Sequence, residues 1–300
     1  MRAVLRLSCL LALGFALDCP RALAQDSPDT EESPARAQIE QLIQQTHSEV
    51  AVAFRSLDGS QELFIRADEL FPAAPAAIQV PIMIELYREA QAGQLRLTDT
   101  IVVHNNFHSL VDDSTYQIDP KTDPDQDLYK SIGKPETLGD LCEHMVANNS
   151  SLAASLLIER LGIGQIRQRI EALHAKGVEL FRGVESSKPS DSKPQNEVSA
   201  RGVLELLWTL AKGQQEDDDA SKQMVGVIAR AALRQLPTAG VPSDPRIADS
   251  IQNMGLGQQA MIVYGPHPFV VVIMSRGITN PETSAELMAQ ITHALASAIT

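Results

Sequence analysis

Strand patterns occur near both ends of this chain and helical patterns fill its middle, and this order constrains the fold most. Residues 34–47 predict a helix that begins after the N-cap Ser33 with a first-turn proline. Two alternating segments then flank a turn at residues 57–60, which predicts a β-hairpin. After Pro237, the apolar run at residues 269–274 predicts a buried strand. We therefore expect an α/β domain of the α+β type with an inserted helical part.

The predicted helices between the hairpin and Pro237 show apolar residues at helical spacing or end at a glycine. They span residues 80–92, 138–147, 152–161, 163–175, 199–211 and 220–236. A strand at 260–263 and an amphipathic helix at 284–299 follow. We expect one domain over 34–300, with an α/β part at 34–70 and 237–300 and a helical part at 71–236.

Residues 1–24 have the pattern of a secretory signal peptide. Two arginines precede an apolar run at residues 7–17, and the small-residue string ALA at 22–24 is typical of a signal peptidase site. The apolar run would span about 16 Å as a helix, whereas the core of a bilayer is about 30 Å thick. We therefore expect cleavage, a secreted or periplasmic location and no integral membrane span.

Residues 25–33 are polar and carry too little apolar surface to pack, so they are interpreted as a linker. Cys19 leaves a lipoprotein as the minor alternative, because Asp18 before it fits a lipidation signal poorly. Cleavage would leave Cys142 as the one remaining cysteine, which excludes an internal disulfide. Cys142 lies in a predicted helix and is expected to be a buried small apolar residue rather than a nucleophile.

Charge and composition argue against nucleic acid as a partner. The chain has 38 Asp plus Glu against 25 Lys plus Arg, for a net charge of -13. A polyanion would be repelled at long range, and 4% aromatic residues leave few rings for base stacking. The 44% of hydrophobic residues is that of an ordinary globular protein.

Two patterns resemble metal sites without fitting one. The alternate aspartates of residues 123–127 have the spacing of a calcium loop, but Leu128 and Lys134 stand where that loop needs glycine and glutamate. A solvated acidic loop is the favoured interpretation. His104 and His108 are four residues apart, but their segment is a poor helix start. We expect no metal and no cofactor.

Several short strings accompany this order of elements. They are LFPAA at 70–74, VPIM at 80–83, HMV at 144–146, LLIERLG at 156–162, RGVE at 182–185, SAR at 199–201, IVY at 262–264 and VVVIM at 270–274. Together they resemble the class A β-lactamase and penicillin-recognising serine hydrolase family over nearly the whole mature chain. The resemblance implies a β-lactamase/transpeptidase-like fold, in which an antiparallel sheet is flanked by helices and carries an inserted helical subdomain.

The family's first motif is a Ser-x-x-Lys pair at the start of a helix, where the lysine amine can share the proton of the serine hydroxyl. Alignment on residues 80–82 places Ala76 at the serine and Gln79 at the lysine. Alanine has no nucleophile, and the amide of glutamine is neither a base nor a cation. The resemblance therefore implies that the first motif is lost.

The second motif, Ser-Asp-Asn or Ser-Ser-Asn, maps to Asn149, Ser150 and Ser151, of which only the central serine matches the family's common variant. No Gly-x-Ser-x-Gly elbow occurs in the chain, so Ser109, Ser150 and Ser151 are interpreted as cap or turn residues rather than replacement nucleophiles. His144 is interpreted as a core or hydrogen-bonded surface residue.

The third motif, a Lys-Thr-Gly strand, maps to Asp249, Ser250 and Ile251. No lysine or arginine occurs from residue 247 to residue 264, so a shift of the alignment does not restore the cation. The fourth part, a loop carboxylate that activates water, maps to Glu185. Without an acyl-enzyme to hydrolyse, that carboxylate has no substrate.

Loss of three motifs in a chain that keeps the surrounding apolar pattern predicts a non-catalytic binding protein, or pseudoenzyme, with an unknown small molecule or protein as its partner. Two alternatives stay open. One is an active serine hydrolase of the family, acting on β-lactams or peptidoglycan-like amides through an unrecognised nucleophile. The other is a partner-binding subunit of the cell envelope.

Overall fold

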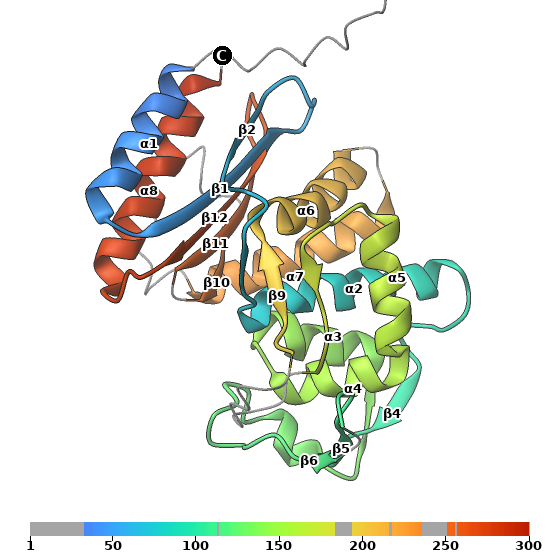
Figure 1. The fold of residues 1–300 in the computed structure, drawn as a ribbon. Coiled ribbons are helices and arrows are strands. Elements are labelled where there is room, and N and C mark those ends of the chain that lie inside the picture. The colour runs from blue at the N-terminus through green and yellow to red at the C-terminus, as the bar shows by residue number, and fades with distance from the viewer. Residues whose placement is uncertain are drawn as a thin grey trace, which may run out of the picture. The chain divides into compact units, whose positions relative to one another are not determined.

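A five-stranded antiparallel sheet joins the two ends of the domain (Figure 1). The computed structural model describes residues 33–112, 114–183, 194–215, 218–235, 251–255 and 257–299. The strands are β1 (Glu49–Ser56), β2 (Glu62–Ile65), β10 (Ile251–Gly255), β11 (Gln258–Val263) and β12 (Phe269–Arg276), in the order β10-β11-β12-β1-β2. Because β1 pairs with β12 over its whole length, the N-terminal hairpin and the C-terminal strands form one sheet. The predicted fold class is confirmed.

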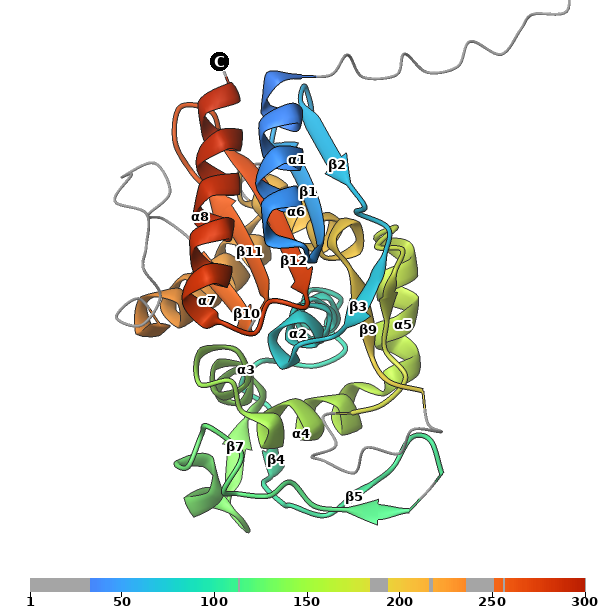
Figure 2. The ribbon, with the colours of Figure 1, turned by 60° about the vertical axis from the view of Figure 1, so that its left-hand side comes forward.

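Both faces of this sheet are covered by helices. Helices α1 (Pro34–Thr46) and α8 (Pro281–Ala298) lie side by side on one face, and α6 (Ala200–Gln215) packs on the other (Figures 1 and 2). Along β1, Val50 and Val52 pack with the first pair of helices, and Ala51 packs with the core of the helical part. Two buried faces explain why β12 is a continuous apolar run rather than an alternating one.

The remaining helices gather around α2 (Pro75–Gln91), which contacts all of them (Figure 2). They are α3 (Leu138–Ala147), α4 (Ser151–Leu161), α5 (Ile163–Ala172) and α7 (Asp219–Gln235). Every residue of α2 from Ala76 to Tyr87 is buried. A helix that is covered on all sides has no polar face, and its beginning therefore leaves little periodic signal in the sequence.

Most predicted helices are confirmed, with differences at their ends. The prediction of a helix start at residue 80 is wrong, because α2 begins at Pro75 and holds Pro81 in its interior. Three other helices differ by three or four residues at one end from the predicted bounds: α5 ends at Ala172, α6 extends to Gln215, and α8 begins at Pro281. Fixed φ makes proline favourable in the first turn, which is where Pro75 and Pro281 stand.

Short strands outside the main sheet complete the described structure and have no counterpart in the sequence prediction. Strand β9 (Glu197–Ser199) lies between β3 (Leu70–Pro72) and β8 (Val178–Glu179). Two further pairs are β4 (Thr100–Val102) with β7 (Pro135–Thr137) and β5 (Phe107–His108) with β6 (Thr115–Tyr116), and a 3-10 turn, η1, spans Leu128–Ser131. Segments of two or three residues carry too little alternation to identify a strand.

None of the helices described between residues 33 and 299 has the length and apolar character needed to cross a bilayer. The predicted signal peptide and nearly all of the predicted linker lie outside the described residues.

An ion pair joins helix α6 to strand β1 of the sheet. Arg55 on β1 donates to both carboxylate oxygens of Glu205 on α6, at 2.7 and 2.8 Å, and its side chain is 15% exposed. Arg55→Leu leaves Glu205 half-buried without that partner, and we expect urea denaturation to show a loss of about 2 kcal/mol in the free energy of unfolding.

The matched control is Arg96→Leu, which removes a side chain that is 82% exposed and that pairs, in the part of the chain that the structure describes, with Asp99 three residues along. We expect a change of less than about 0.5 kcal/mol there. Equal losses in the two variants would show that the pair between β1 and α6 has no special contribution.

Candidate functional site

The residues mapped to the first two motifs meet where α2 begins. Gln79 lies one helical turn after Ala76 and is 1% exposed. Its Nε2 donates a hydrogen bond of 2.6 Å to Oδ1 of Asn149, in the connection between α3 and α4. Its Oε1 is buried and has no hydrogen-bond partner among the described residues. Two neutral amides therefore face each other at the start of this helix, and Ala76 beside them carries no reactive group.

The backbone of the α3–α4 connection places Asn149 toward α2. Asn149 has φ of 55°, in the left-handed region that asparagine tolerates better than most residues. Ser150 follows as the N-cap of α4, and its Oγ accepts a hydrogen bond of 3.2 Å from the backbone N–H of Ala153. The interpretation of Ser150 as a cap residue is confirmed. Ser151 is the first residue of α4.

The other mapped residues are placed only in part. Ile251 begins β10, where it stands opposite Met261 on β11. Asp249, Ser250 and Glu185 lie outside the described residues, so their assignment to the third and fourth motifs stays a prediction.

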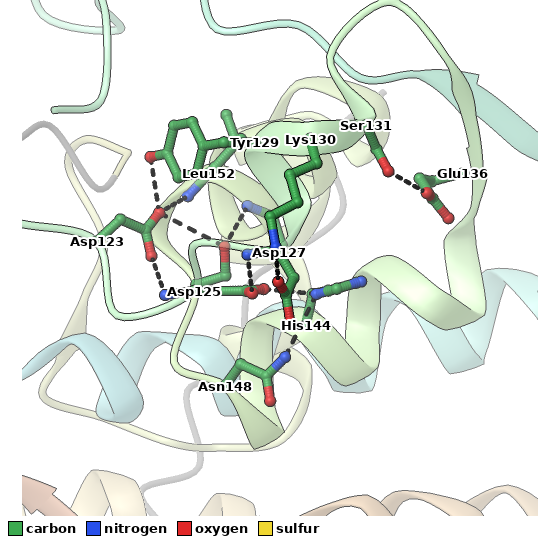
Figure 3. Close-up of polar contacts among 12 residues, drawn as sticks. Asp123, Asp125, Asp127, Tyr129, Lys130, Ser131, Glu136, His144, Asn148 and Leu152 are labelled. Atoms are coloured by element: carbon green, nitrogen blue, oxygen red, sulfur yellow. Dashed lines mark hydrogen bonds and ion pairs between the residues drawn. The ribbon is translucent and has the colours of Figure 1, made fainter. Parts of the chain in front are cut away.

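The acidic segment at 123–127 differs from its prediction as a solvated loop. Of its three aspartates, Asp123 and Asp125 are buried, and Asp127 is exposed and pairs with Lys130 (Figure 3). The side chains turn inward because each has a partner there: Asp123 accepts from the backbone N–H of Leu152, and Asp125 bonds to a histidine on α3. The alternating spacing of the aspartates therefore places two of them against α3 and α4, where they form hydrogen bonds, instead of on a hydrated surface.

His144 is that histidine, and its Nδ1 lies 2.5 Å from Oδ2 of Asp125. The interpretation of His144 as a hydrogen-bonded residue is confirmed. His104 pairs with Glu159 across 2.8 Å instead of facing a metal site. The described residues contain no cluster of three or more His, Cys, Asp or Glu side chains arranged to hold a metal ion.

A surface pocket of about 250 Å³ opens beside this network. Its lining residues are Glu136, Asp140, Glu143, His144, Ala147 and Asn148. Three carboxylates on this wall make it unfavourable for an anion and acceptable for a cation or a neutral molecule.

Comparison with known proteins identifies the family. A model of the β-lactamase enzyme family matches residues 34–299. This chain belongs to that family. No curated protein sequence matches it.

Solved structures of the family share the fold. The β-lactamase from Sphaerobacter thermophilus has a TM-score of 0.68 at 19% identity, covering 89% of this chain and 97% of that one. The β-lactamase from Xanthomonas campestris has a TM-score of 0.69 at 16% identity, with 88% and 96% covered. PBP-A has a TM-score of 0.64 at 19% identity, with 87% and 95% covered. At these identities the likeness concerns the fold alone.

Substitutions at Asn149 separate the hydrogen bond from the backbone conformation. Asn149→Gly keeps the left-handed backbone available but leaves the Gln79 amide buried without its acceptor, so we expect a loss of about 1–2 kcal/mol in the free energy of unfolding. Asn149→Ala adds the cost of a left-handed alanine, about 1 kcal/mol more. Urea denaturation measures both. A glycine variant as stable as the parent would show that the amide pair contributes nothing.

Cys142 is fully buried on α3, and burial raises the pKa of its thiol to about 12. The reactive thiolate is therefore scarce at neutral pH. We expect iodoacetamide at pH 8 to leave the Cys142 peptide unmodified in the folded protein and to modify it fully in 8 M urea, as read by peptide mass mapping. Rapid modification of the folded protein would contradict this burial.

Proposed function

We propose that this chain is a non-catalytic member of the β-lactamase family, an exported protein that acts by binding. The observation that carries the proposal is the buried amide pair of Gln79 and Asn149, with Ala76 one turn before it. The resemblance places the family's nucleophile, its base and its proton relay at these three positions.

The chemistry of these side chains supports binding rather than acyl transfer. A serine nucleophile needs a neighbouring group that takes its proton, and the two act as a unit whose loss removes nearly all catalysis. A methyl group and two amides supply neither function. Gln79 and Asn149 bond to each other, so this hydrogen bond stabilises the junction of α2 with the α3–α4 connection and is not directed to a substrate.

Negative charge at two places in the protein indicates which class of ligand it can bind. The carboxylate of Asp249 occupies the position that the resemblance assigns to the family's cation, and the pocket beside His144 is lined by carboxylates. A ligand with its own carboxylate, such as a penicillin, would be repelled at both places. A neutral or cationic small molecule, or a protein partner in the cell envelope, is compatible with them.

The signal-peptide pattern at residues 1–24 supports export. An active hydrolase with an unrecognised nucleophile is the competing function, and the shared fold favours it, because a mutant of PBP-A is known as an acyl-enzyme complex with penicillin G. Intact-protein mass and nitrocefin hydrolysis together separate the two functions, because an acyl-enzyme either persists as a covalent adduct or is hydrolysed by water with release of product.

The prediction is that the chain starting at Gln25 keeps its mass after incubation with a penicillin and a cephalosporin, and that it does not hydrolyse nitrocefin above the buffer rate. An active class A β-lactamase treated in parallel is the positive control for nitrocefin hydrolysis. An adduct or turnover would overturn the proposal, and peptide mapping of the adduct would then identify the nucleophile.

A further inference from the structure

The start of α4 is held by a carboxylate from a distant segment. Asp123 lies between β6 and η1 and is 3% exposed. Its Oδ2 accepts a hydrogen bond of 2.9 Å from the backbone N–H of Leu152, in the first turn of α4. The same oxygen accepts one of 3.0 Å from the hydroxyl of Tyr129 and lies 3.5 Å from the hydroxyl of Ser150 (Figure 3).

These contacts explain why a carboxylate can be buried here. Leu152 presents a first-turn N–H that has no partner within the helix, and the N-terminus of a helix carries partial positive charge. The carboxylate also accepts from the backbone N–H of Asp125 through Oδ1, at 3.1 Å. Burial and the neighbouring carboxylate of Asp123 raise the pKa of Tyr129 above its ordinary value, so this hydroxyl stays a donor.

The segment also reaches the other helix of the connection. Asp125, two residues after Asp123, bonds to His144 in the last turn of α3. Residues 123–125 therefore bridge the end of α3 and the beginning of α4. Asn149 lies between these two attachment points, in its left-handed conformation.

Two residues share the capping of α4. Ser150, the N-cap, satisfies the N–H of Ala153, and Asp123 satisfies the N–H of Leu152. A serine hydroxyl at the N-cap bonds one of these donors, whereas an aspartate at the N-cap has two oxygens for the second and third N–H groups of the helix.

We propose that Asp123 is the positioning residue of the candidate site: by fixing the first turn of α4 it holds Asn149 where its Oδ1 accepts from Gln79. This deepens the proposed function, on which it rests, by naming the side chain that keeps the amide pair together. Asp123 acts through the backbone of the connection.

The test moves the carboxylate from one segment to the other in the full chain. Asp123→Ser removes it, and the double variant Asp123→Ser with Ser150→Asp returns it at the N-cap. Asp127→Ser is the control, since that carboxylate is exposed and forms its ion pair among the described residues with Lys130. The readout is hydrogen exchange of the Gln79 side-chain amide by NMR, identified by its absence in Gln79→Leu. Thermal unfolding of each variant is recorded alongside.

We expect exchange of the Gln79 amide to become at least about tenfold faster in Asp123→Ser, and to return to within about threefold of the parent in the double variant. Asp127→Ser should leave it unchanged. Unchanged exchange in Asp123→Ser, or no recovery in the double variant, would overturn the positioning role. If Asp123→Ser does not fold, the double variant decides, because a folded protein with a protected Gln79 supports the role and an unfolded one overturns it.

These outcomes are separable from those of the proposed function. A penicillin adduct would overturn the non-catalytic proposal while leaving the exchange results intact. Loss of the positioning role would leave the mass of the penicillin-treated protein unaffected.

Discussion

Burial of α2 on every side is the constraint on which the rest of the structure depends. Among the described elements, this helix contacts α3, α4, α5, α6, α7 and the edge strand β10, and residues Ala76–Tyr87 have no exposed face. Any polar group on it must be satisfied inside the protein, because an unbonded buried polar group costs free energy. Glu85 meets this demand through Arg169 on α5, at 2.7 Å, and Nε2 of Gln79 meets it through Asn149, whereas Oε1 of Gln79 has no partner among the described residues. The polar positions of one helix thus determine which side chains its neighbours present.

The same constraint explains the site. The residues from Pro75 to Gln79 carry no hydroxyl, thiol or charged group, and the hydrogen bond that Gln79 donates among the described residues goes to Asn149. The left-handed backbone of Asn149 is supported on both sides, by the histidine bond of Asp125 and by the capping bond of Asp123. A buried network of this kind fixes one arrangement, because each member would lose its partner if another moved.

The fold was largely accessible from the sequence, because the helical periodicity of segments such as residues 138–147 and the continuous apolar run at residues 269–274 encode it. The beginning of α2 was not, because a helix buried on all sides gives no contrast between faces, and Pro81 obscured it further. For the site, the resemblance identified Gln79 and Asn149 as motif positions. Their hydrogen bond could not be predicted, because it joins side chains 70 residues apart in the sequence. The burial of Asp123 was equally invisible, since its partner Leu152 lies on a different element.

The most direct test of a non-catalytic site is a crystal structure of the full domain after soaking with penicillin G. We expect Gln79 Nε2 within about 3 Å of Asn149 Oδ1, and no electron density joined to any side chain near the start of α2. Continuous density from a serine or other nucleophile to an opened β-lactam ring, with Gln79 turned away from Asn149, would contradict the proposal.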